Sequence, residues 1–281
     1  MTTPVGSDGV VVDDKAGVRT ITLSRPDRKN ALDWPAWCAL RDVLEDTSRN
    51  SEARVVILTG AGGSFCAGAD ISKPDARHPA AKMRILTDVA MALHDLQIPT
   101  IAKVTGVAVG AGWNLALGCD LVVATPDARF SQIFSRRGLS MDLGGSWLLP
   151  KLVGLQQAKR LALFAEMIDA AEAHTLGLVT WVVSADEIDA FVVERARHLA
   201  DGPPIALAQI KMLLNEGASA TLRDALAAES LSQVVNFGTS DVAAAYAAFA
   251  QKKDPVFTGR WAVPPPGADR EETRSERSDH A

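Results

Sequence analysis

The sequence of 281 residues is poor in cysteine and has no excess of positive charge. Its three cysteines (Cys38, Cys66 and Cys119) are an odd number, and each lies in an apolar or glycine-rich setting. This pattern is typical of reduced, buried thiols rather than of a disulfide framework. The net charge of −5 argues against a protein that binds nucleic acid or an anionic membrane through a global basic field.

The chain also lacks the long apolar segments of membrane proteins. No apolar run reaches the roughly 18 residues that a membrane-spanning helix needs. The first residues, Met1–Lys15, have neither the basic region nor the apolar region of a secretory signal. With 47% hydrophobic residues, the chain still has ample material for a buried core. We therefore expect a cytoplasmic globular protein.

Several well-known ligand motifs are absent. The glycine-rich segment Gly63–Gly68 is followed by alanine and aspartate, where a phosphate-binding loop needs a lysine. Gly110 and Gly112 are followed by Leu115, where a dinucleotide fingerprint needs its third glycine. Ser146 lacks the second glycine of a nucleophile elbow. The five histidines show no metal-ligand spacing among themselves or with the cysteines, so we expect no metal.

What the chain does contain is an alternation of strand-like and helix-like segments. Short β-rich or apolar runs bounded by turn residues predict strands at Val10–Val12, Val18–Leu23, Arg54–Thr59, Thr100–Val104 and Leu178–Val183. Helical spacing or capping signals predict helices at Asp33–Ser48, 79–95, Leu155–Ala165, Ala170–Leu176 and Asp186–Ala200. The first two strands flank a turn and are expected to form a hairpin. These elements predict an α/β core.

A glycine and two prolines at 202–204 form the clearest boundary in the sequence. We expect residues 1–202 to form the core and residues 203–262 to form a helical region. Three helices without strands are predicted there, at Ile205–Asn215, Thr221–Asn236 and Ser240–Gln251. Residues 263–281 are rich in proline and charge, have no apolar face and are expected to be disordered.

The residues typical of a catalytic site gather in the stretch Val104–Pro150 and in one glycine-rich segment before it. That segment, at 62–70, and the segment at 106–112 each follow a predicted strand. One interpretation is that these glycines only make tight turns; the other is that they allow backbone N–H groups to approach a ligand closely. Two such loops together suit the stabilisation of negative charge that develops on a carbonyl oxygen.

The second glycine-rich turn of this stretch, Gly138–Gly145, holds a single acid, Asp142, among glycines and apolar residues. One interpretation is that Asp142 caps the helix that contains Trp147. The other is that partial burial raises its pKa and makes it a useful base. Trp113, Trp147 and Trp181 are interpreted as core residues rather than as parts of a cofactor site.

From about Val11 to Arg260 the chain resembles the crotonase, or enoyl-CoA hydratase/isomerase, superfamily. The resemblance rests on several long segments in the right order: Arg25-Pro26 with Asn30-Ala31-Leu32, RVVILTGAGGSFCAGADI (54–71), VTGVAVGAGWNLALGCDLVVA (104–124), LGGSWLLPKLVG (143–154), AAEAHTLGLVTWVV (170–183) and FTGR (257–260). It implies a spiral core of repeated ββα units with a C-terminal helical trimerisation region. It also implies acyl-CoA thioester substrates, a homotrimer or dimer of trimers, and no separate cofactor, because coenzyme A is part of the substrate.

The resemblance also implies site residues. The backbone N–H groups of Ala69 and Ala111 fall at the family's oxyanion hole, which holds a thioester enolate. Asp142 and Asn114 fall at positions of catalytic side chains. The substrate and coenzyme A positions are Arg28, Ala31, Ala67, Gly68, Asp70, Ile71, Gly110 and Phe134.

Two departures from the family's pattern bear on the reaction. Hydratases of the family hold water between two glutamates, and the matching positions here are Asn114 and Phe134. An amide cannot act as a general base, and a phenyl ring cannot bind water as a carboxylate does. Asp142 coincides with the aspartate of other branches, and GLSMDLGGSWLLPKLVG is most similar to the ring isomerase of the phenylacetate pathway. The resemblance therefore favours an isomerase, with an enoyl-CoA hydratase and a non-catalytic acyl-CoA-binding protein as alternatives.

Overall fold

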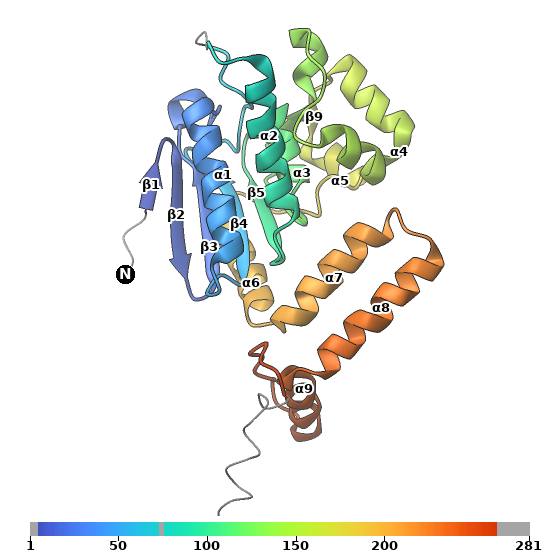
Figure 1. Cartoon of the computed structure of the whole chain (residues 1–281). Coiled ribbons are helices and arrows are strands. Elements are labelled where there is room, and N and C mark those ends of the chain that lie inside the picture. The colour runs from blue at the N-terminus through green and yellow to red at the C-terminus, as the bar shows by residue number, and fades with distance from the viewer. Residues whose placement is uncertain (1–4, 73–75, 263–281) are drawn as a thin grey trace, which may run out of the picture. The chain divides into compact units, whose positions relative to one another are not determined.

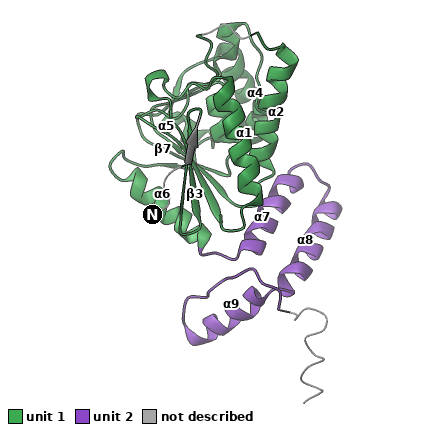
Figure 2. Cartoon of the chain, turned by 60° about the vertical axis from the view of Figure 1, so that its left-hand side comes forward, with its two compact units in different colours: residues 1–200 green, residues 201–281 purple. Residues whose placement is uncertain are grey.

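The computed structural model describes residues 5–72 and 76–262 (Figure 1). Contacts divide the chain into two compact units, Met1–Ala200 and Asp201–Ala281 (Figure 2). The boundary expected at residue 202 lies beside this division. The tail expected to be disordered, residues 263–281, lies outside the described residues.

Within the described part of the first unit, seven strands form one sheet in the order β1-β2-β3-β4-β5-β7-β10. The first three strands are antiparallel neighbours, and all later neighbours are parallel. The strands are β1 (Val5–Ser7), β2 (Val10–Lys15), β3 (Val18–Leu23), β4 (Val55–Gly60), β5 (Thr100–Val104), β7 (Leu121–Ala124) and β10 (Trp181–Val182). The predicted α/β class is confirmed.

Helices cover both faces of this sheet because successive strand residues point to opposite sides. Val56 of β4 belongs to the main core, to which α1 (Trp34–Arg49) and α2 (Pro79–His94) contribute buried side chains. Val55 belongs to a second cluster with residues of α6 (Ile188–Ala200). The two views show α1 and α2 side by side on one face and α6 on the other (Figures 1 and 2).

A smaller sheet carries the segments rich in glycine. Its strands are β6 (Val107–Val109), β8 (Arg129–Ser131) and β9 (Ile168–Asp169), in the order β6-β8-β9. Helical segments follow these strands: α3 (Ala111–Leu117), η2 (Ile133–Arg137), α4 (Gly145–Phe164) and α5 (Ala170–Thr175). The buried rings of Trp113 and Phe130, with centroids 5.5 Å apart, pack α3 against β8. The turns at the ends of β6 and β8 are thereby held close together.

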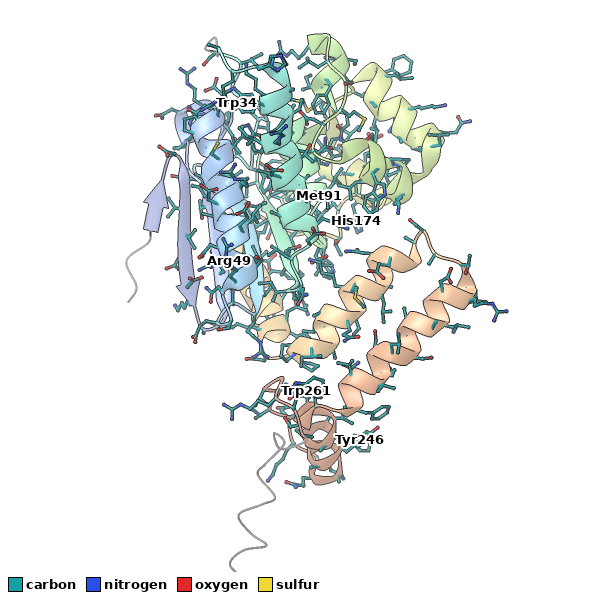
Figure 3. All side chains as sticks on the ribbon, in the orientation of Figure 1. Trp34, Arg49, Met91, His174, Tyr246 and Trp261 are labelled. Carbon is teal, nitrogen blue, oxygen red and sulfur yellow. The ribbon has the colours of Figure 1, made fainter. Side chains whose placement is uncertain are left out.

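The second unit contains α7 (Pro204–Gly217), α8 (Leu222–Phe237) and α9 (Ser240–Gln251). Within residues 201–262, no apolar side chain is buried. Large apolar residues are instead exposed, including Leu231 at 71% and Phe249 at 86%. Figure 3 likewise shows Tyr246 pointing away from α9. Residues 201–262 therefore form no hydrophobic core of their own.

Polar contacts fix the corner between α8 and α9. The carboxylate of Asp241 accepts hydrogen bonds from the backbone N–H groups of Thr258 and Gly259, at 2.8 and 3.0 Å. Trp261 packs on Gly238, where an added Cβ would lie 2.7 Å from the indole ring. The segment after α9 therefore returns along this corner (Figure 3).

Some predicted elements differ from the observed ones. The strand expected at Leu178–Val183 shrinks to two residues, because the part of it before Trp181 does not form a ladder with β7. The helix expected at Leu155–Ala165 begins ten residues earlier, and Gly154 interrupts it with φ 74° and ψ 161°. Trp147 is 44% exposed on this helix, so its interpretation as a core residue is wrong.

Of the helices in the described segments, none has the length and apolar character required to cross a membrane. Across the same segments, no three His, Cys, Asp or Glu side chains are grouped as metal ligands would be.

Candidate functional site

The two glycine-rich loops lie against each other. The loop after β4 pairs with β6 because Cys66 donates its backbone N–H to Val107 and accepts one from Val109, at 3.0 and 2.9 Å. A Cβ on Gly112 would lie 2.2 Å from the carbonyl oxygen of Cys66. A Cβ on Gly68 would lie 2.8 Å from the carbonyl oxygen of Val109. Only glycine permits this approach of the two backbones.

This approach brings two backbone donors into one neighbourhood. A Cβ on Gly68 would lie 3.6 Å from the nitrogen of Ala111, so the segment that contains Ala69 borders the start of α3. Ala111 is the first residue of α3, where N–H groups have no partner inside the helix. Within the described segments, neither Ala69 nor Ala111 donates its backbone N–H to another residue. Neither N–H group is therefore used by the described part of the protein itself.

Asp142 does not cap a helix, so that interpretation is wrong. The N-cap of α4 is Gly144, whose φ of 74° is left-handed, and no side chain bonds to this end of the helix. Oδ1 of Asp142 is buried and has no hydrogen-bond partner among the described residues. Burial raises the pKa of Asp142 from 3.8 to about 6. A hydrogen bond from its own backbone N–H lowers the pKa by a smaller amount. The result is a carboxylate of increased basicity.

Asn114 connects α3 to the turn that carries Asp142. Its Nδ2 donates to the carbonyl oxygen of Asp142 at 2.8 Å, and its Oδ1 accepts from Nε2 of Gln132 at 2.8 Å. Asn114 is 1% exposed and Gln132 is fully buried. Gln132 was not predicted to be a site residue, although an amide flanked in the sequence by Phe130 and Phe134 was a signal that a polar partner lies nearby.

Phe134 lies beside the second glycine-rich loop, residues 106–112. Its Cζ would be 3.7 Å from a Cβ on Gly110, and its side chain is buried. Gly110 in turn donates its N–H to the carbonyl oxygen of Ser131 at 2.8 Å. An apolar ring therefore occupies the position next to the start of α3.

The residues expected to bind the substrate divide into an inner and an outer group. Ala67 and Gly68 lie in the first loop, which pairs with the turn at 29–32 through backbone hydrogen bonds. Asp70 is ion-paired with Arg25 at 3.2 Å. Hydrogen bonds from Ser72, together with Arg25, lower the pKa of Asp70. Arg28 and Ile71 have exposed side chains at the outer edge.

Arg25 and Asn30 also hold this site. Both contribute to the family resemblance, but neither was predicted to be a site residue. The guanidinium of Arg25 also contacts the carbonyl oxygen of Ala31 and the carboxylate of Asp33. Asn30 is fully buried with φ 55°. Its side chain accepts from the N–H of Arg25 and donates to the carbonyl oxygens of Ala61 and Ser64. The first glycine-rich loop is thus tied to the turn before α1.

Comparison with known proteins shows to which protein family this chain belongs. The model of the enoyl-CoA hydratase/isomerase family matches residues 13–260. The chain is 37% identical to the 1,2-epoxyphenylacetyl-CoA isomerase of Escherichia coli strain K12, covering 87% of this chain and 96% of that one. It is 35% identical to the short-chain-enoyl-CoA hydratase of Clostridium acetobutylicum, covering 88% and 96%.

A solved structure leads to the same family. The crystal structure of an enoyl-CoA hydratase from Polaromonas sp. JS666 superposes with a TM-score of 0.84 at 35% identity, covering 89% of this chain and 99% of that one. The predicted crotonase-type fold is therefore confirmed. Relatives named as isomerases and as hydratases both match over nearly their whole length. The chain belongs to the enoyl-CoA hydratase/isomerase family and is an acyl-CoA enzyme of that family.

Proposed function

We propose that this enzyme isomerises an enoyl-CoA, or a related ring acyl-CoA, through a thioester enolate. The carboxylate of Asp142 removes a proton from a carbon near the thioester, and the electron pair moves onto the thioester oxygen. The N–H groups of Ala69 and Ala111 stabilise that oxygen. Asp142 then returns the proton to a different carbon as the electron pair re-forms a carbon–carbon double bond.

The observation that carries this proposal is the environment of Asp142. Its raised pKa, about 6, is near the range in which a general base is most effective at neutral pH. Its buried Oδ1 has no partner among the described residues, which makes the carboxylate unfavourable for stability. A protein that only bound acyl-CoA would gain nothing from an acid in this position. The environment therefore supports catalysis over the non-catalytic alternative.

Hydration is the second candidate, because some relatives carry hydratase names. Two features argue against it here. The amide of Asn114 uses both of its polar atoms inside the protein, and Phe134 presents a phenyl ring beside Gly110. Each missing acid–base group typically lowers the rate by about 10²–10⁴-fold. Brisk hydration would need water to be activated by another group.

The products of the wild-type enzyme separate these functions. With a short 2-enoyl-CoA, we expect double-bond migration, which leaves the mass unchanged, and hydration at least about 10²-fold slower. Liquid chromatography with mass detection distinguishes the isomer from the hydroxyacyl-CoA, which is heavier by one water. A hydroxyacyl-CoA as the main product would overturn the isomerase assignment. No turnover with bound acyl-CoA would favour the non-catalytic alternative.

The proposed substrate site is the edge of the first loop. Coenzyme A would lie along 67–71 and near the turn that carries Arg28 and Ala31. Coenzyme A enters as part of the substrate, so we propose no separate cofactor. A cytoplasmic location is part of the same proposal.

We propose that the second unit assembles copies of this chain into a homotrimer or a dimer of trimers. The support is the absence of any buried apolar side chain within residues 201–262, together with the exposed Leu231 and Phe249. Three helices without a core gain their stability by burying such side chains against another surface. A second copy supplies that surface without a further protein.

Light scattering tests this assembly. We expect the wild type to be a trimer or hexamer at micromolar concentration, and the double variant Leu231→Glu/Phe249→Glu to shift towards monomer, because burying two carboxylates in an apolar interface is unfavourable. Val193→Glu, at an exposed apolar position on α6, is the matched control and should leave the assembly unchanged. A monomeric wild type would contradict the proposal.

A further inference from the structure

A chain of two buried amides runs from the end of β8 to Asp142. Gln132 follows β8 directly, and its Nε2 donates to Oδ1 of Asn114 on α3. Asn114 in turn donates a hydrogen bond from its Nδ2 to the carbonyl oxygen of Asp142. Both links are 2.8 Å long. The amides therefore connect β8, α3 and the turn of Asp142.

The direction of these hydrogen bonds allows one orientation of the Asn114 amide. If the amide turned over, its oxygen would face the carbonyl oxygen of Asp142 and its nitrogen would face Nε2 of Gln132. Both contacts would then place like groups together. The carbonyl oxygen of Asp142 can only accept a hydrogen bond, so it selects the orientation of the Asn114 amide. Oδ1 of Asn114 then faces Gln132 and accepts from its Nε2, while Oε1 of Gln132 is buried without a partner among the described residues.

The end of β8 also holds the neighbouring backbone donor. Ser131, the residue before Gln132, accepts the N–H of Gly110, and Gly110 precedes Ala111. On the other side, Gly145 packs so closely on Asn114 that an added Cβ would lie 2.4 Å from Nδ2. Ala111 and Asn114 are carried on the same short helix. One strand end therefore fixes the start of α3 and, through Asn114, the turn of the carboxylate.

From this geometry we propose that Gln132 and Asn114 are positioning residues, which set the place of the Asp142 carboxylate relative to the Ala111 N–H. The inference rests on the proposed function, because the positioned groups are its base and one of its donors. In this proposal, the two amides act through the turn of Asp142 and through α3 rather than through contact with the substrate. Their contribution is that the base is already aligned when the enolate forms.

Gln132→Met tests the hydrogen-bonded link between the two amides, because it removes the Nε2 donor of residue 132 and keeps much of the side-chain volume. We expect kcat to fall about 10-fold with little change in KM, because the proposed coenzyme A contacts lie elsewhere. Release of the turn exposes Asp142 to water, and less burial lowers its pKa. The acid limb of the rate profile should therefore move to lower pH. Gln157→Met, an exposed glutamine on α4, should change neither.

Gln132→Glu is the conservative variant that separates positioning from packing. A protonated glutamic acid still donates to Oδ1 of Asn114, whereas the ionised form does not. The rate of this variant relative to wild type should therefore fall as pH rises. A purely structural role would lower the melting temperature of Gln132→Met without moving the acid limb.

A double-mutant cycle and a direct titration complete the test. In an Asn114→Leu background, Gln132→Met should add little further loss, since the link is already broken. The titration of Asp142, followed by carbon-13 NMR of labelled aspartate and assigned with Asp142→Asn, should have a lower midpoint in Gln132→Met. An unchanged midpoint or full additivity would overturn the positioning role. The NMR readout needs no turnover, so a wild type without isomerase activity would count against the proposed function alone.

Discussion

Replacing Asp142 by asparagine is expected to reduce isomerase turnover by about 10²-fold or more, because an amide cannot take up the substrate proton. Acyl-CoA binding should persist, since the proposed oxyanion donors at Ala69 and Ala111 belong to the backbone. In the wild type, kcat/KM should rise as pH increases through about 6, where the carboxylate ionises. Steady-state assays across pH 5–8 and calorimetric binding of an unreactive acyl-CoA analogue measure these effects.

The same variant should become more stable at neutral pH. The pKa of Asp142 is raised from 3.8 to about 6 by burial, so the folded protein holds the proton more tightly than the unfolded chain. The favourable contribution of the protonated acid is present below pH 3.8 and is lost as pH rises through about 6. Above that pH, Asp142→Asn removes a buried charge and should stabilise the fold by about 2–3 kcal/mol. The gain should disappear in acid.

Asp169→Asn is the matched control. Asp169 does cap a helix, because its carboxylate accepts the N–H of Glu172 at 2.8 Å at the start of α5. Asparagine caps nearly as well as aspartate, so turnover and stability should change little. An Asp142→Asn enzyme that kept its full turnover would show that another group moves the proton.

Gly112→Ala is expected to damage stability and turnover together. The added Cβ would lie 2.2 Å from the carbonyl oxygen of Cys66 and 2.8 Å from its carbonyl carbon. Backbone atoms cannot rotate away as a side chain can, so α3 must move away from the first loop. Overpacking of this kind costs about 1–3 kcal/mol. Displacing the Ala111 N–H, one of the two proposed oxyanion donors, is expected to lower kcat by about 10²–10³-fold.

Thermal unfolding and steady-state kinetics of Gly112→Ala check this expectation. Gly217→Ala, at the end of α7, is the control because a Cβ there meets no atom within 4 Å. It should keep the wild-type rate and melting temperature. If Gly112→Ala behaved in the same way, the two loops would not be in the close contact that the structure shows.

Elements with strong local signals were predicted accurately. The strand Thr100–Val104 and the helix Ser240–Gln251 have the predicted bounds, and Asp33 caps α1 as expected. Their hydrophobic patterns and end signals lie within the segments themselves. The bounds of β10 depend instead on where β7 offers hydrogen-bond partners. Such pairing cannot be inferred from local sequence.

In the site too, features with local sequence signals were predicted, and contacts between distant residues were not. The two glycine-rich loops could be found because their composition and their place after strands are local features. Asn30 and Gln132 were missed because their partners lie far along the chain: Ser64 is 34 positions from Asn30, and Asn114 is 18 from Gln132. Asp142 was ambiguous for a related reason. Aspartate before a helix predicts a cap, and only the left-handed Gly144 shows that the helix starts without one.

The order of the site residues along the chain has a consequence for protein synthesis. The two loops and α3 are complete once Leu117 has left the ribosome, whereas the carboxylate and its amide link require residues up to Asp142. The sheet is still unfinished at that stage, because β7 gains its neighbour β10 only when Val182 has emerged. Since domains fold as units, the nascent chain carries exposed glycine-rich loops through much of translation. One face of the sheet stays uncovered for longer still, until α6 has emerged as far as Ala200.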